Sequence, residues 1–125
     1  MQFACDDGSV PAAGFISRYK TAYDTAAAIA GLDEPHEMLE RYLDASGFEE
    51  VKVVIKKLPV GTWPRDPKKK EIGQWGLAMI EPGLMSYGFA LFTRYLGMTE
   101  PEATVLCRGA FEEFQRKDVH AYVAL

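Results

Sequence analysis

The chain has few cysteines and no long hydrophobic run. Cys5 and Cys107 lie far apart, with no further cysteine and no nearby histidine, so the sequence indicates neither a disulfide framework nor a zinc site. No apolar stretch approaches the roughly 20 residues that a membrane-spanning helix needs, and the first residues lack the basic start and apolar stretch of a signal peptide. We therefore expect unpaired thiols and an intracellular protein, cytoplasmic or nuclear, that does not enter a membrane.

The short motifs that mark common enzyme sites are also missing. The sequence contains no GxGxxG after a strand, no Walker loop, no GxSxG and no HExxH. The adjacent glutamates Glu49-Glu50 and Glu112-Glu113 would point in different directions on a helix or strand, so we interpret both pairs as solvated surface. The residues alone identify no catalytic residue and no metal ligand.

Composition and charge fit one folded domain. Hydrophobic residues make up 48% and charged residues 26% of the 125 positions, as in ordinary globular proteins. The net charge is −4, but residues 51–70 carry seven lysines and arginines against Asp66 alone. A basic patch can meet nucleic acid or an acidic partner. Because no nucleic-acid motif accompanies it, we expect a solvated face and no nucleic-acid partner.

Hydrophobic periodicity predicts two helices and then a strand in the first half. Apolar residues recur every three or four positions from Phe15 to Ile29, and Gly31 ends that helix. A second helix is expected from a cap at Asp33 to Gly47. Residues 48–58 then switch to a period of two, which predicts a strand.

The second half predicts three helical segments and a last strand. Asp66 and Pro67 have the residue types of a helix start, and Pro82-Gly83 is expected to break or kink that helix before residues 84–96 resume it. Thr99 and Glu102 have the spacing of a capping box for a helix to about Lys117, and residues 119–125 read as a strand. The predicted buried face of the helix after Asp66 consists of Ile72, Trp75, Met79 and Ile80.

Four residues are candidates for a substrate pocket: Trp63, Trp75, Tyr87 and His120. The three aromatic residues could line a pocket for a flat ligand, or they could belong to the core. His120 would face opposite to Val119 and Ala121 on its strand, but no partner for it is visible in the sequence.

Several stretches, in order along the chain, together resemble one family: the fungal LaeA-like S-adenosylmethionine-dependent methyltransferases. The stretches are DDGS (6–9), GFEEV (47–51), LPVGTWPRDP (58–67), KEIG (70–73), ALFTRYLGMT (90–99) and VHAY (119–122). The resemblance covers nearly the whole chain but matches only the C-terminal part of such an enzyme. It places Met1 near the fifth strand of the family and Leu125 inside its final strand.

The resemblance implies an α/β, Rossmann-like fold, of which residues 1–125 would be a partial domain: the mainly helical C-terminal portion with two or three strands. Residues 11–46 and 67–117 would cover the sheet and shape the substrate entrance. The family's glycine-rich cofactor turn and its acidic ribose-binding residue are absent here. We therefore expect no S-adenosylmethionine binding by this chain alone. Two hypotheses follow: an inactive, substrate-capping part of a methyltransferase, or a non-catalytic module that self-associates or pairs with a protein partner through uncovered apolar faces.

Overall fold

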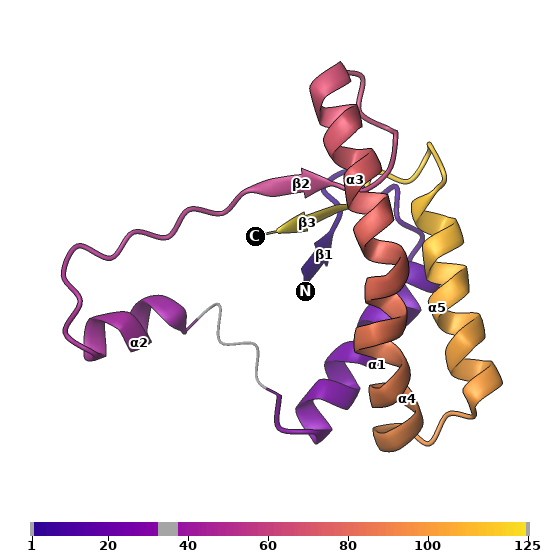
Figure 1. Cartoon of the computed structure of the whole chain (residues 1–125), viewed down its shortest axis with the longest axis horizontal. Coiled ribbons are helices and arrows are strands. Elements are labelled where there is room, and N and C mark those ends of the chain that lie inside the picture. Colours follow the sequence, from indigo (N-terminus) through magenta and orange to yellow (C-terminus); the bar gives the residue numbers. More distant parts are fainter. Residues whose placement is uncertain (1, 33–37, 125) are drawn as a thin grey trace.

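A three-stranded antiparallel sheet and a layer of helices beside it make up the body of the protein (Figure 1). The computed structural model describes residues 2–32 and 38–124. The expectation of a mainly helical chain with about three strands is confirmed. In chain order the elements are β1 (Gln2–Ala4), α1 (Phe15–Ile29), α2 (Leu39–Ala45), β2 (Lys57–Pro59), α3 (Pro67–Leu84), the π-helical turn η2 (Met85–Phe89), α4 (Ala90–Tyr95), α5 (Glu100–Phe114) and β3 (Tyr122–Ala124).

The strands lie in the order β1-β3-β2, with β3 antiparallel to both neighbours. β1 and β2 therefore run parallel to each other. Tyr122 at the start of β3 pairs with Ala4 on one side and with Pro59 on the other. The carboxyl ends of β1 and β2 and the first residue of β3 thus share one edge of the sheet.

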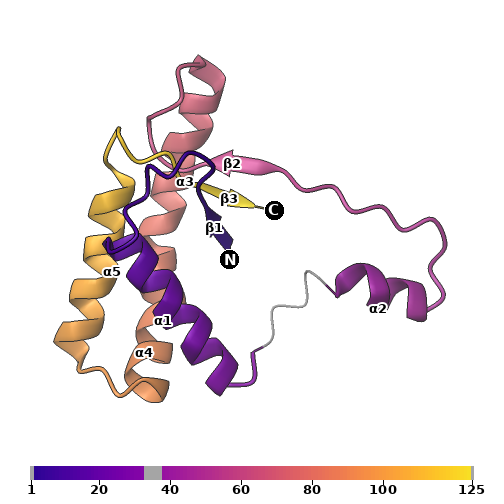
Figure 2. The same cartoon turned by 180° about the vertical axis from the view of Figure 1, so that it is seen from behind.

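The core lies between the sheet, α1, α5 and the helical segment η2–α4 (Figure 2). Phe92, Phe114 and Leu84 are fully buried there. The expected apolar stripe of α1 is confirmed for Tyr19, whose hydroxyl donates to the carbonyl of Leu84 at 2.9 Å. Ile29, at the end of the same stripe, is exposed, because the helix has passed the core by then.

The predicted buried face of α3 is wrong for three of its four residues. Ile72, Trp75 and Met79 are exposed, and only Ile80 is buried. The helix instead packs the face that carries Gly73 against the chain after β2. A Cβ at Gly73 would lie 1.9 Å from the carbonyl oxygen of Gly61, so only glycine allows this approach.

α3 is not broken at Pro82. It continues to Leu84 and passes into η2 and then α4, so the chain stays helical while the hydrogen-bond pattern widens to that of a π-turn. The helix starts predicted at Asp66 and at Thr99 are confirmed. The Asp66 carboxylate accepts from the amide of Lys69 at 2.9 Å, and Thr99 and Glu102 form a capping box.

The predicted strand over residues 48–58 is mostly wrong. Only Lys57–Pro59 pairs with β3, and the apolar residues Val53, Val54 and Ile55 before it are exposed. Together with α2, which has no buried residue, residues 39–56 form an arm that reaches away from the body in both views (Figures 1 and 2). The predicted cap at Asp33 lies outside the described residues. Among those that are described, no helix combines the length and apolar character needed to cross a bilayer.

Candidate functional site

Three loops meet at the sheet edge where β1 and β2 end. They are residues 6–9 after β1, residues 60–64 after β2, and residues 119–121 before β3; we call this the loop junction. All three belong to the stretches that carry the family resemblance, although they are more than 50 residues apart in sequence. The loop junction thus gathers polar and aromatic side chains from three separate stretches at one end of the sheet.

His120 is the centre of the loop junction. Its Nδ1 lies 2.5 Å from Oδ2 of Asp7, and its backbone amide donates to Oγ of Ser9 at 2.8 Å. The indole ring of Trp63 stacks on the imidazole with a centroid distance of 4.9 Å. The predicted orientation is confirmed, since Val119 is fully buried while the His120 side chain is 38% exposed. The structure therefore brings together two of the four predicted site residues, Trp63 and His120.

Trp63 is held in place by its own ring nitrogen. Nε1 donates to the carbonyls of Val60 and Ala121, each at 3.1 Å. Because Ala121 follows His120 directly, this bond fixes the indole against the strand that carries the histidine.

A second polar group flanks the loop junction. The Asp6 carboxylate accepts from the Lys57 ammonium at 2.8 Å and from the Tyr122 hydroxyl at 2.5 Å, and the ammonium also lies over the Tyr122 ring. The hydrogen bond from Lys57, followed by that from Tyr122, lowers the pKa of Asp6. All these side chains reach solvent except Tyr122, so the group ties residues 6–9 to the sheet without forming a closed site.

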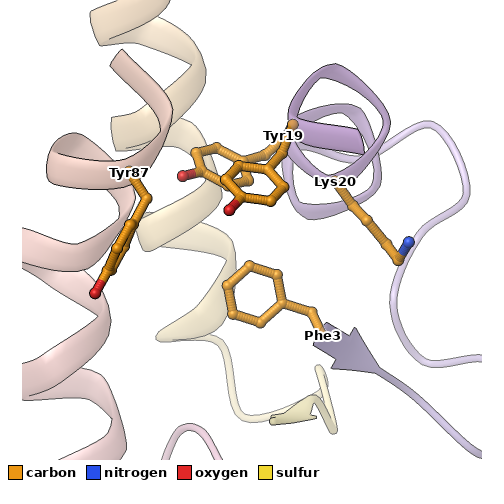
Figure 3. Close-up of a pocket in the computed structure, with 5 residues that line it drawn as sticks. Phe3, Tyr19, Lys20 and Tyr87 are labelled. Atoms are coloured by element: carbon orange, nitrogen blue, oxygen red, sulfur yellow. The ribbon is translucent and has the colours of Figure 1, made fainter. Parts of the chain in front are cut away.

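The other two predicted site residues lie elsewhere. Trp75 is 69% exposed on the outer side of α3. Tyr87 is 57% exposed and stands on η2 beside Phe3 and Tyr19, as Figure 3 shows, while Lys20 points away from these rings. The space between the rings has a volume of about 10 Å³, which holds no more than one water. A role for Trp75 or Tyr87 in substrate binding stays a prediction.

A larger cavity of about 260 Å³ lies between β1, α1 and the loop after β1. Its walls include the apolar side chains of Phe3, Val10 and Ile16, with Cys5 and Lys20 also lining it. Ala121 lines it too, so the cavity and the imidazole of His120 lie on opposite sides of residues 119–121. The predicted strand over residues 119–125 is thus shorter than expected, because pairing begins only at Tyr122. The cavity has the apolar walls and few polar groups that are typical of small-molecule sites.

Glu113 is the functional carboxylate that the sequence interpretation missed. It was interpreted as solvated surface, but it is only 7% exposed, and its Oε2 accepts from the amide of Ile16 at 2.7 Å. Gly14 caps α1 without a side chain, so Glu113 supplies the missing acceptor from another helix. The sequence gives little indication of this contact. The capping position of α1 holds Gly14 instead of a residue with a capping side chain, and the carboxylate that replaces it is 99 positions away.

The described residues do not fit the cofactor that the resemblance implies. A nucleotide-type cofactor needs a glycine-rich turn that leads from a strand to a helix with a free N-terminus. In this structure two helices follow strands: α1 follows β1, and α3 follows β2. The N-terminus of α1 is occupied by the Glu113 carboxylate, and that of α3 by Asp66. Nor do any three His, Cys, Asp or Glu side chains within the described ranges come close enough to hold a metal ion.

Comparison with known proteins finds relatives along nearly the whole chain. Methyltransferase pytC of Aspergillus terreus is 33% identical over 93% of this chain. The secondary metabolism regulator LAE1 of Cochliobolus heterostrophus is 28% identical over 98% of it, and the protein-methionine methyltransferase laeA of Chaetomium globosum is 26% identical over 94%. No family model and no solved structure matches.

The chain spans only 36%, 40% and 37% of the length of these three relatives, respectively. Their names agree with the resemblance carried by the loop-junction stretches. The chain is thus homologous to the C-terminal part of the fungal LaeA-like methyltransferases.

Proposed function

We propose that this chain is the C-terminal, substrate-capping portion of an S-adenosylmethionine-dependent methyltransferase of fungal secondary metabolism, and that it is inactive alone. The observation that carries the proposal is the loop junction: three stretches of the family resemblance come together at one end of the sheet. The acceptor would lie at the loop junction, on the side of His120, and α1 and α5 form the supporting layer behind the sheet.

The sheet itself supports a partial, Rossmann-like domain over residues 1–125. Within the described residues β1 pairs only with β3 and β2 pairs only with β3. A strand needs hydrogen-bonding neighbours for its backbone groups, and a larger parallel sheet next to β1 would supply them. The cofactor-binding turn would then belong to that other part of the sheet.

The expected compartment is intracellular, cytoplasmic or nuclear. Cys5 and Cys107 are both free thiols, which suits a reducing environment. We propose no membrane partner and no nucleic-acid partner.

Calorimetry with S-adenosylmethionine tests the proposal. The isolated chain is expected to give no binding heat, while full-length pytC of A. terreus serves as the positive control. A version of pytC truncated before the homologous third is then mixed with this chain, and recovery of methyl transfer above that of either part alone supports the capping role. Micromolar binding by the isolated chain would overturn the claim that it is inactive alone for want of a cofactor site.

The second candidate is the non-catalytic module that self-associates or binds a full-length methyltransferase. It is favoured by the exposed apolar row of Ile72, Trp75 and Met79 on α3, since large apolar groups in one row on a surface often mark an interaction site. Light scattering after gel filtration is the test. A dimer or a complex with pytC that Trp75→Gln abolishes supports this candidate, and a monomer that leaves pytC unbound counts against it.

A further inference from the structure

Three contacts hold His120, one on its backbone amide and two on its imidazole ring. Ser9 accepts from its backbone amide at 2.8 Å, Asp7 contacts Nδ1 at 2.5 Å, and Trp63 covers one face of the ring at 4.9 Å. Such a ring has little freedom to turn, although its side chain is still 38% exposed. A fixed yet accessible histidine is the arrangement found where a proton has to be taken up at a defined place.

The partner on Nδ1 determines which nitrogen is free. Hydrogen bonds from the Ser9 side chain, and after it from the Cys5 thiol and the Ser9 amide, hold the pKa of Asp7 far below its usual range. An ionised carboxylate can only accept, so Nδ1 must carry the hydrogen. In the neutral ring Nε2 is then a bare acceptor, and no described residue donates a hydrogen bond to it.

Two carboxylates lie near the ring. Asp7 lies directly on Nδ1, and Asp118, two residues before His120 in the chain, is paired with Arg116. The ring also lies at the loop junction, where β1 and β2 end.

We propose that Nε2 of His120 receives the proton of the methyl acceptor, and that the acceptor therefore carries a hydrogen on the atom that is methylated, as an O–H, N–H or S–H compound does. Asp7 is the positioning residue. In this step the bond between the acceptor atom and its hydrogen breaks, the electron pair stays on the acceptor atom, and the proton forms an N–H bond at Nε2, from which water later removes it. A thioether acceptor has no such proton to lose, so it would have no use for this base. The inference rests on the proposed function, because it assigns the acceptor class of that reaction.

The first test is the tautomer of His120. In a long-range proton–nitrogen NMR spectrum of the neutral ring, the hydrogen is expected on Nδ1 in the wild type. Asp7→Ala is expected to release this preference, and Asp7→Glu to restore it in part. A hydrogen on Nε2 in the wild type would overturn the inference, because that nitrogen could not take up a proton.

The second test uses 4-nitrophenol, whose absorption distinguishes phenol from phenolate. Below the pH at which the free probe ionises, the wild-type chain is expected to raise the phenolate fraction severalfold. His120→Asn and His120→Gln are expected to abolish the increase, and Asp7→Ala to reduce it at least fivefold. Trp75→Gln, a change of an exposed residue on α3, is expected to leave it unchanged. Circular dichroism checks that each variant is folded. No increase with the wild type, or an increase that both His120 variants retain, would overturn the inference.

These tests contain no methyl donor and need no other part of the enzyme. The calorimetric test of the proposed function contains no phenol. If the chain ionises the probe but does not restore methyl transfer to truncated pytC, the capping role is contradicted, while the role of His120 as a base is still supported. If the chain restores methyl transfer but does not ionise the probe, the role of His120 as a base is contradicted, while the capping role is still supported.

Discussion

The buried carboxylate of Glu113 should be a main support of α1. Its Oε2 accepts from the Ile16 amide at 2.7 Å in the first turn, where Gly14 offers no capping side chain. A hydrogen bond to a charged group contributes about 1.5–3 kcal/mol, and a helix cap about 1 kcal/mol. These values describe the same contact and are not added, so we expect Glu113→Ala to lower the free energy of unfolding by about 2–3 kcal/mol. Glu113→Gln keeps an acceptor oxygen and should cost about 1 kcal/mol, the share of the charge at the helix N-terminus.

Urea unfolding followed by circular dichroism measures these differences. The matched control is the neighbouring exposed Glu112, whose change to alanine should alter stability by less than about 0.5 kcal/mol. If Glu113→Ala proves as mild as Glu112→Ala, the carboxylate does not cap α1 and the reasoning is refuted.

Gly14 allows a second, independent check on the same contact. A Cβ at this position would lie 2.2 Å from Oε1 of Glu113, so Gly14→Ala should push the carboxylate off the helix. In a chain that already carries Glu113→Ala, the new methyl group has nothing to displace. We therefore expect a coupling of at least about 1 kcal/mol between the two changes, and strictly additive costs would contradict the packing described.

Three further predictions concern other parts of the chain. Gly73→Ala should cost about 3 kcal/mol or more in urea unfolding, because its Cβ would meet a backbone carbonyl at 1.9 Å; a near-neutral result would mean that α3 does not lie so close to the chain after β2. Burial raises the pKa of Cys107 to about 11, so a thiol reagent at about pH 8 should label Cys5 alone until denaturant is added, and rapid labelling of both would contradict the buried position. Thr99→Ala should cost about 1 kcal/mol through its lost cap. Because hydrogen bonding to Thr99, first by its amide, lowers the pKa of Glu102, the carboxylate's contribution is present above about pH 4.3 and disappears as acid protonates it, so the costs of Thr99→Ala should shrink in acid.

The wrong face of α3 shows what periodicity cannot detect. A search for apolar residues at helical spacing selects Ile72, Trp75 and Met79, which are exposed. The real contact is made by Gly73, whose carbonyl accepts from the amide of Gly61 at 3.0 Å. Glycine contributes nothing to a hydrophobic pattern. A contact that depends on close backbone approach at a glycine therefore cannot be detected from the spacing of apolar residues.

The shortened strand has a different cause. The alternation of Val51, Val53 and Ile55 is a genuine strand pattern, but a strand also needs a partner for its backbone. The register of β2 and β3 pairs Lys57 with Ala124, and nothing described lies opposite the residues before Lys57. Local helix signals needed no such partner, which is why the caps at Asp66 and Thr99 were correctly predicted.

The candidate site was predictable only in its parts. Trp63 and His120 were each selected for their own chemistry, but they are 57 positions apart in the sequence. Asp7 entered the sequence analysis only as part of the family stretch at residues 6–9, and its bond to His120 spans 113 positions. One signal in the sequence linked these loops: they all belong to stretches that resemble the same family. No local pattern in any single loop predicts that the three loops lie together.

Most polar groups at the loop junction already make contacts with other described residues. The helix N-termini after β1 and β2 already bind carboxylates, so neither can accept the polar end of a nucleotide. Asp6 is neutralised by Lys57 and Tyr122, and Asp7 is committed to fixing the histidine. Among the polar groups at this sheet edge, Nε2 of His120 has a free lone pair that faces solvent. These contacts favour the proposal that Nε2 of His120 takes up the proton of the methyl acceptor.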